Sequence, residues 1–189
     1  MIYKISKRLR KRLLIVMENT MRRKTSTLER YMIFFGRQYP LNFGFKVTVS
    51  GKLDEAKIRD TLITLAKRHP IVYAHQEYTR GKQMDMVLDD LPPLLVTRRE
   101  GGEAWQKALL SCMTREFDMF TGPLFSLDYR YVGTGTELLF VFQHGAADGI
   151  AATYFINDFL TLYAGLPVAI PENPTLPMLY EVMDEAVYK

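Results

Sequence analysis

Residues 138–149 read LLFVFQHGAADG, and this segment is the most informative part of the sequence. The uninterrupted apolar run from Leu138 to Phe142 is typical of a β-strand that is buried on both faces. Small and polar residues follow, and a helix is predicted directly after them, over about 150–163. His144 therefore stands at the end of a buried strand, where a sheet can hold the backbone while the side chain faces a ligand.

Outward from this stretch, period-two patterns predict further strands. Phe125, Leu127, Tyr129 and Tyr131 alternate with polar neighbours, and Gly133-Thr134-Gly135 supplies a turn, so a hairpin is predicted with the apolar run as its second strand. Phe43, Phe45, Val47 and Val49 alternate in the same way. Strands are expected over 43–50, 71–78, 84–88, 125–131 and 138–142.

Apolar residues at helical spacing predict three helices. Asp54 is placed to cap the first, and His69-Pro70 ends it because proline disfavours helical geometry in the residue before it. The second covers about 103–116 and places Cys112 in the core. The third covers about 150–163 and is expected to be largely enclosed. Strands and helices in this order indicate an α/β or α+β fold, with helices packed on a sheet.

The charge is unevenly distributed. The chain has 189 residues and a net charge of +4, but residues 1–24 hold nine Lys/Arg and one acid, a net +8, against 16 basic and 20 acidic residues in the remainder, a net −4. A basic arm on a mildly acidic domain argues against a nucleic-acid-binding body. The arm is predicted to form a cationic amphipathic helix, either as a packed or solvated extension or as a contact for an anionic membrane or acidic partner.

Prolines at 167, 171, 174 and 177 indicate a linker near the C-terminus. We therefore divide the chain into a basic arm (1–24), one folded unit (25–166) and a Pro-rich linker with a short terminal segment (167–189).

Composition excludes several classes of site. Cys112 is the single cysteine, so no intramolecular disulfide forms, and the histidines at 69, 75 and 144 are too scattered for zinc-ligand spacing. We expect no metal. No apolar stretch approaches the roughly 20 residues that span a bilayer, and none forms a typical signal-peptide core. A cytoplasmic location is expected.

His144 is the strongest candidate for catalysis, because an imidazole with an ordinary pKa of about 6.5 can accept a proton near neutral pH. Small residues at 145–147 would leave its ring unobstructed. Two roles are open for Asp148, capping the following helix or pairing with an arginine. Gly149 would permit a backbone conformation that other residues avoid.

Four segments occur in the order of a known family: Ser26–Met32, Val49–Pro70 with its Arg-His-Pro corner, Phe117–Leu124 with Phe-Asp and Gly-Pro-Leu, and His144–Gly149 as H-x-x-x-D-G. Together they resemble the N-terminal half of the chloramphenicol acetyltransferase-like superfamily, which includes condensation domains and alcohol acyltransferases. The resemblance implies a half-domain with a mixed, mostly antiparallel sheet.

It also implies that the domain transfers an acyl group from a thioester to an alcohol or amine. His144 would be the general base, Asp148 a structural, salt-bridged residue, and Gly149 a residue that serves the turn. No permanent cofactor is implied, because acyl-CoA or a carrier-protein phosphopantetheine thioester is the co-substrate. Cys112 is expected to be a packing residue, His69 to complement a helix C-terminus, and His75 to take part in no constellation.

The sequence departs from the family in two places. Condensation domains usually carry a second histidine before the catalytic one, and here that residue is Gln143, which favours a stand-alone acyltransferase. A second half with a DFGWG-type segment is not found, so a second half-domain or another subunit is expected to complete the site. A compact self-associating acyltransferase, a peptide-synthetase condensation domain and a non-catalytic half-domain that binds through its basic arm remain as alternatives.

Overall fold

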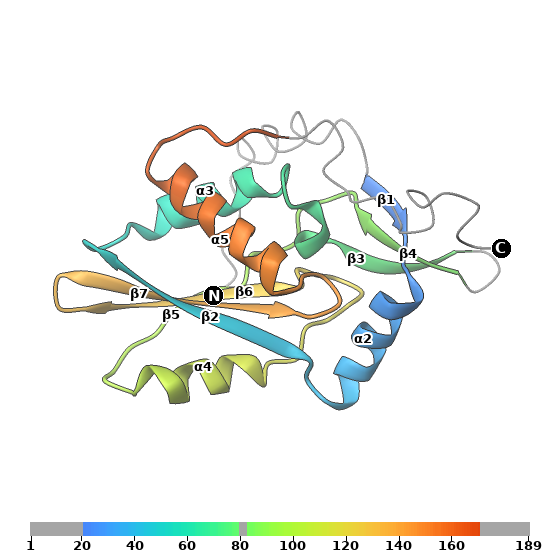
Figure 1. Ribbon diagram of the computed structural model, residues 1–189, viewed down its shortest axis with the longest axis horizontal. Helices are drawn as coiled ribbons and strands as arrows, with labels where there is room; N and C mark the ends of the chain where they lie inside the picture. Colours follow the sequence, from blue (N-terminus) through green and yellow to red (C-terminus); the bar gives the residue numbers. More distant parts are fainter. Residues whose placement is uncertain (1–20, 80–82, 171–189) are drawn as a thin grey trace.

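The computed structural model describes residues 21–79 and 83–170, which form two β-sheets and the helices packed on them (Figure 1). The four-stranded sheet has the order β2-β7-β6-β5, and the three-stranded sheet has the order β1-β4-β3. The predicted arm helix and most of the proposed C-terminal linker lie outside the described residues. Leu166–Ile170 carry no regular structure.

The four-stranded sheet contains the apolar run from Leu138 to Phe142. Strands β2 (Asn42–Ser50), β7 (Gly135–Gln143) and β6 (Phe125–Val132) pair antiparallel, and β5 (Val96–Arg98) pairs parallel with β6. The predicted mixed, mostly antiparallel sheet is confirmed, as are the hairpin and the strand at 43–50.

Strand β7 is buried on both faces, as predicted. Leu138, Phe140 and Phe142 pack in the main core with residues of α3 (Glu55–Leu65) and α5 (Gly149–Tyr163). Leu139 and Val141 pack on the opposite side against Ala108 and Cys112 of α4 (Trp105–Met113). Figure 1 shows α3 and α5 on one side of this sheet and α4 on the other.

The three-stranded sheet consists of β1 (Met21–Lys24), β4 (Gln83–Leu88) and β3 (His75–Thr79). Strand β1 belongs to the stretch assigned to the basic arm, so the folded unit extends back at least to Met21. The prediction of a strand from 71 was wrong, because Pro70 begins a 3-10 helix, η1 (Pro70–Tyr73). Proline is well suited to the first turn of a helix, since it lacks an N–H to donate.

Helix α2 (Thr27–Gln38) was not predicted, although a capping box marks its start. The Glu29 amide donates to Ser26 Oγ at 3.1 Å, and the Ser26 amide donates to Glu29 Oε2 at 2.7 Å. The cap predicted for the first helix is confirmed, because Asp54 Oδ1 accepts from the Lys57 amide at 2.8 Å.

The other two predicted helices differ in detail. Helix α4 is shorter than predicted, and Trp105 is 36% exposed. The expectation that α5 is largely enclosed was wrong, because Ile150 and Tyr154 are 71% and 61% exposed. Only the face with Phe155 and Phe159 is buried. None of the helices in the described ranges combines the length and apolar character needed to cross a bilayer.

Helix α5 is anchored to the end of α3 by a buried aspartate. Asp158 is 5% exposed and accepts from His69 Nε2 at 2.7 Å and from the Arg68 guanidinium. The His69 ring also lies against Phe155. His69 was expected to complement the C-terminus of the helix before it, and instead its ring joins two helices.

The pH dependence of stability should report on His69. Burial lowers the pKa of His69 from its ordinary value of 6.5, against the opposing effect of Asp158. Below pH 6.5 the unfolded chain therefore binds a proton that the folded chain binds less readily, so the free energy of unfolding falls as the pH falls. We expect His69→Gln to flatten this dependence between pH 7.5 and 5.5 in urea titrations. An unchanged slope in the variant would assign the dependence to other groups.

A second buried carboxylate lies beneath α4. Asp128 is 1% exposed and contacts Arg115 Nη2 at 3.1 Å, Arg99 Nη1 at 3.4 Å and the Cys112 thiol at 3.3 Å. Burial and the Asp128 charge raise the pKa of Cys112 to about 11. Cys112 is therefore a packing residue, as predicted, and is poorly suited to nucleophilic chemistry.

We expect Asp128→Ala to lower the free energy of unfolding by about 2–3 kcal/mol, because two guanidinium groups lose their shared, hydrogen-bonded partner. Chemical denaturation measures the change. Glu100→Ala is the control, since the Glu100 side chain is 79% exposed and should change stability by no more than about 0.5 kcal/mol. Equal effects of the two substitutions would contradict this role for Asp128.

Candidate active site

His144 lies directly after β7, at the edge where β2 begins. Its amide donates to the Leu41 carbonyl at 2.9 Å, which continues the pairing of the two strands by one residue. Its ring centroid is 5.0 Å from that of Phe43, which also stacks on Phe142. The side chain is exposed, and no residue in the described part of the chain forms a hydrogen bond with a ring nitrogen. The sheet thus presents the imidazole to solvent.

Gln143 holds the loop that carries this histidine. Its side chain is buried, with the residue 6% exposed, and both ends of the amide are used. Oε1 accepts from the Gly145 amide at 2.5 Å, and Nε2 donates to the Met32 carbonyl of α2 at 3.1 Å. In the sequence, Gln143 stands out only as a departure from the condensation-domain pattern. In the structure its side chain positions the loop. A polar residue directly after the apolar run from Leu138 to Phe142 is the signal that could have indicated this role.

Gly145, and not Gly149, is the glycine that the loop requires. A Cβ at Gly145 would lie 2.6 Å from Ile33 Cγ1, 2.9 Å from Gln143 Oε1 and 3.1 Å from the Glu29 carbonyl, so the small residue lets α2 approach. Gly149 is the first residue of α5, has no positive φ, and a Cβ there would meet nothing within 4 Å. The special backbone conformation expected for Gly149 is therefore wrong.

Asp148 caps α5. Its Oδ1 accepts from the Ala151 amide at 2.7 Å. The salt bridge implied by the family resemblance is absent among the described residues, so of the two roles left open for Asp148 the structure supports capping. Asp148 also forms no hydrogen bond with His144, and the pair is not a catalytic dyad in this geometry.

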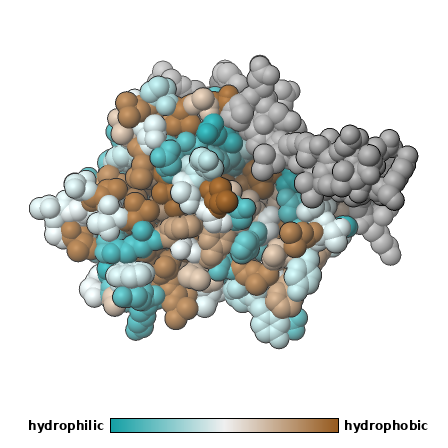
Figure 2. Space-filling view, viewed as in Figure 1, coloured by the Kyte–Doolittle hydropathy of each residue, from teal (hydrophilic) through white to brown (hydrophobic). Residues whose placement is uncertain are grey.

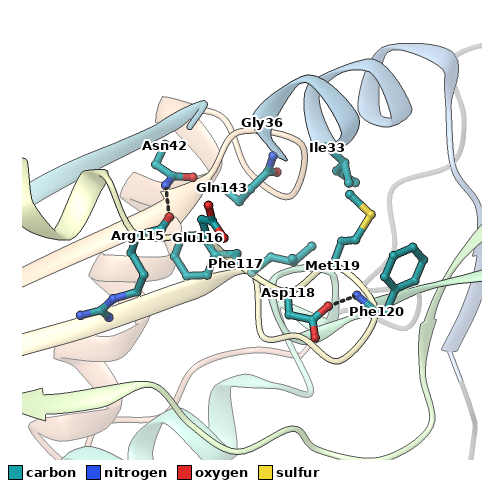
Figure 3. A pocket seen from close by; sticks show the side chains of 11 residues that line it. Ile33, Gly36, Asn42, Arg115, Glu116, Phe117, Asp118, Met119, Phe120 and Gln143 are labelled. Atoms are coloured by element: carbon teal, nitrogen blue, oxygen red, sulfur yellow. Dashed lines mark hydrogen bonds between the residues drawn. The ribbon is translucent and has the colours of Figure 1, made fainter. Parts of the chain in front are cut away.

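A hollow of about 390 Å³ lies beside the histidine loop (Figure 3). Gln143 lines it and His144 does not, because successive residues of an extended chain point to opposite faces of the sheet. Figure 3 shows the guanidinium of Arg115 pointing away from the hollow, while the Asn42 amide donates to the Arg115 carbonyl at 2.8 Å. The hollow is therefore lined by Gln143 of the candidate site and not by the proposed base.

Large apolar side chains are exposed on both helices that flank the histidine loop. Figure 2 shows hydrophobic residues at the surface in the region of α2. On α5, Ile150 and Tyr154 are exposed, as noted above, and both belong to its first two turns. The large apolar and aromatic residues exposed on α2 and its C-cap are Leu28, Tyr31, Phe34, Phe35 and Tyr39, at 37–64%.

Part of the chain is similar in sequence to a curated protein. No protein-family model matches the chain. Over 133 residues the chain is 26% identical to tyrocidine synthase 3 of Brevibacillus parabrevis, a match that covers 70% of this chain and 2% of that protein. The chain thus spans a very small part of this curated relative.

Comparison with solved structures confirms the fold that the sequence resemblance implied. The starter condensation domain of rhizomide synthetase matches with a TM-score of 0.66 and 12% identity, covering 79% of this chain and 40% of that one. The condensation domain of the monacolin K polyketide synthase gives 0.66 and 12%, with 80% and 36% covered. Polyketide synthase associated protein 5 of Mycobacterium tuberculosis gives 0.58 and 22%, with 85% and 37% covered. The chain has the α+β fold of about two fifths of a condensation domain.

The two glycines of the loop should differ in their response to alanine. We expect Gly145→Ala to lower the free energy of unfolding by about 1–3 kcal/mol, because the added methyl group overpacks the contact with α2. Gly149→Ala is the matched control and should stabilise the chain by about 0.4–1 kcal/mol through the unfolded state. Urea denaturation compares them. A larger loss at 149 than at 145 would contradict the geometry.

Proposed function

We propose, from the chloramphenicol acetyltransferase-like fold that this chain shares with condensation domains, that it is one half-domain of an acyltransferase. The acyl group passes from a thioester to an alcohol or amine, and His144 is the general base. The observation that carries the proposal is a solvent-exposed imidazole at the end of β7, packed in a tilted arrangement against Phe43 and free of hydrogen bonds from the described residues.

The proposed reaction begins with proton transfer. A neutral imidazole has one ring nitrogen that can accept, and His144 takes the acceptor's proton as the acceptor oxygen or nitrogen attacks the thioester carbonyl. The tetrahedral intermediate then collapses, the carbon–sulfur bond breaks, and the departing thiolate takes a proton from the imidazolium. His144 returns to its neutral form. This route needs neither a covalent acyl-enzyme nor a metal.

The neighbouring residues support this role indirectly. The Gln143 amide fixes the loop to α2, so the position of the ring follows from the backbone and from Phe43. Asp148 begins α5 by capping it. We propose that Gln143 and Asp148 position the base and do not exchange protons with the substrate.

The thioester donor has two candidate sources. Acyl-CoA is supported by a solved complex of a structurally similar starter condensation domain variant with C8-CoA. A carrier-protein phosphopantetheine thioester is supported by the similarity to tyrocidine synthase 3 and to a four-domain nonribosomal peptide synthetase. Both present an acyl group on sulfur, so the chemistry proposed for His144 is the same.

A second protein surface is proposed to complete the site. The matched region covers only 36–40% of the solved condensation-domain chains, so more than half of each chain lies outside it. Ile150 and Tyr154 on α5, and the aromatic residues of α2, leave apolar area exposed on both sides of the histidine loop. We propose that a second half-domain or another subunit covers this area and excludes water from the reaction.

Replacement of the proposed base tests the function. We expect His144→Ala to lower the rate of thiol release from acyl-CoA about 10²–10⁴-fold in the presence of a panel of amine and alcohol acceptors, because general-base catalysis contributes a factor of this size. The assay should include the second half-domain or subunit where the site requires one.

Folding of the variant is controlled by thermal unfolding. The His144 side chain is exposed and forms no hydrogen bond within the described residues, so the midpoint of His144→Ala should match that of the parent chain. Undiminished thiol release by the folded variant would exclude His144 as the base.

A further inference from the structure

Four ionisable side chains meet on one face of the three-stranded sheet. His75 and Glu77 lie two residues apart on β3, and Asp85 pairs with Glu77 across β4. Because side chains alternate along a strand, these residues and Asp89, just beyond β4, share that face. His75 Nε2 is 3.4 Å from Glu77 Oε1, and His75 Nδ1 is 4.0 Å from Asp89 Oδ1. One ligand atom from each of these three residues lies within 4.8 Å of the others.

One guanidinium orients part of this cluster. Arg22 of β1 contacts Glu77 Oε2 and reaches Asp85 Oδ2 at 3.0 Å. The other oxygen of Glu77, Oε1, is thereby directed to His75. Arg22 thus acts as a hydrogen-bonding neighbour that fixes a ligand carboxylate, as the second shell of a metal site commonly does.

The positive charge of the cluster falls short of its negative charge. The cluster holds three carboxylates, and the one guanidinium, that of Arg22, contacts only Glu77 and Asp85. Lys24, which pairs with Asp85 across β1 and β4, forms no ion pair in the described part of the chain. Asp85 is 7% exposed, and its Oδ1 has no hydrogen-bond partner. A buried carboxylate oxygen without a partner is costly, and a nearby cation would offset that cost.

We propose that His75, Glu77 and Asp89 bind a divalent transition-metal ion. One imidazole and two carboxylates form the mixed nitrogen and oxygen ligand set that suits Zn²⁺. Three protein ligands leave the fourth position to water, and the three side chains range from 17% to 51% exposed, so the ion can enter from solvent. Asp85, on the same face of the sheet, adds a further negative charge to the cluster.

The expectation of no metal site was based on the spacing of histidine and cysteine residues in the sequence. That spacing does not show carboxylates such as Asp89, which the pairing of β3 with β4 brings close to His75. The metal site is independent of the proposed acyl transfer. His144 is not part of the cluster, and no step of the proposed reaction uses the ion.

Zn²⁺ and Co²⁺ are the probes for the test. The full chain, freed of metal with a chelator, should bind one equivalent of Zn²⁺ in calorimetry, raise its unfolding midpoint, and give Co²⁺ a visible absorption band. His75→Ala and Asp89→Asn should each weaken Zn²⁺ binding at least tenfold. The Asp89 side chain is 51% exposed, so Asp89→Asn should not disturb folding. Asp89→Asn therefore tests the site even where His75→Ala fails to fold. His144→Ala, which removes an imidazole outside the cluster, should bind Zn²⁺ as the parent does.

Absence of saturable Zn²⁺ binding by the parent chain would overturn the proposal and leave an ion-pair network with a histidine. Binding that survives in both His75→Ala and Asp89→Asn, or that is lost only in His144→Ala, would place the ion elsewhere and would also overturn it. Mg²⁺ at the same concentration is the control for nonspecific attraction to carboxylates, and equal stabilisation by Mg²⁺ would count against a transition-metal site.

Discussion

The buried amide of Gln143 is the contact on which the candidate site depends. Its two ends join α2, through the Met32 carbonyl, to the loop after β7, through the Gly145 amide. Leaving either group unpaired in this buried position would cost about 1–3 kcal/mol, so the contact holds the loop in one place. Gly145 permits the close approach of α2 that brings these groups together. The exposure of the His144 ring is a consequence of this arrangement, since the backbone on both sides of it is fixed.

The elements predicted correctly are those whose pattern lies within one continuous segment of the chain. Strand β7 is apolar from Leu138 to Phe142, and its turn and partner strand lie next to it in the chain, so the hairpin was predicted correctly. Helix α2 was missed because its outer face is aromatic instead of polar, although Ser26 and Glu29 form a capping box. The special backbone conformation expected at Gly149 is not found. The steric requirement for a glycine at position 145 was missed, because the approach of α2 is a tertiary contact with no sequence spacing of its own.

The sheet presents His144 in a different way from the one that its sequence position suggested. Ligands bind beyond the carboxyl ends of strands in parallel α/β sheets, but β7 lies in a mostly antiparallel sheet. Here His144 is presented because β2 begins opposite the end of β7, with the Leu41 carbonyl holding the His144 amide and Phe43 supporting the ring. The apolar residues left exposed on α2 and α5 lie on either side of this point, which is where a second protein surface would have to dock for the site to exclude water.

His144 is proposed to be a reachable base whose loss alone lowers the rate of acyl transfer about 10²–10⁴-fold. Diethyl pyrocarbonate, which acylates accessible neutral imidazoles, tests it most directly when peptide mass spectrometry follows each of the three histidines. We predict that His144 reacts faster than the buried, Asp158-bonded His69, and that thiol release declines in proportion to modification of His144. Slow modification of His144, or transfer activity that persists after its modification is complete, would contradict the account.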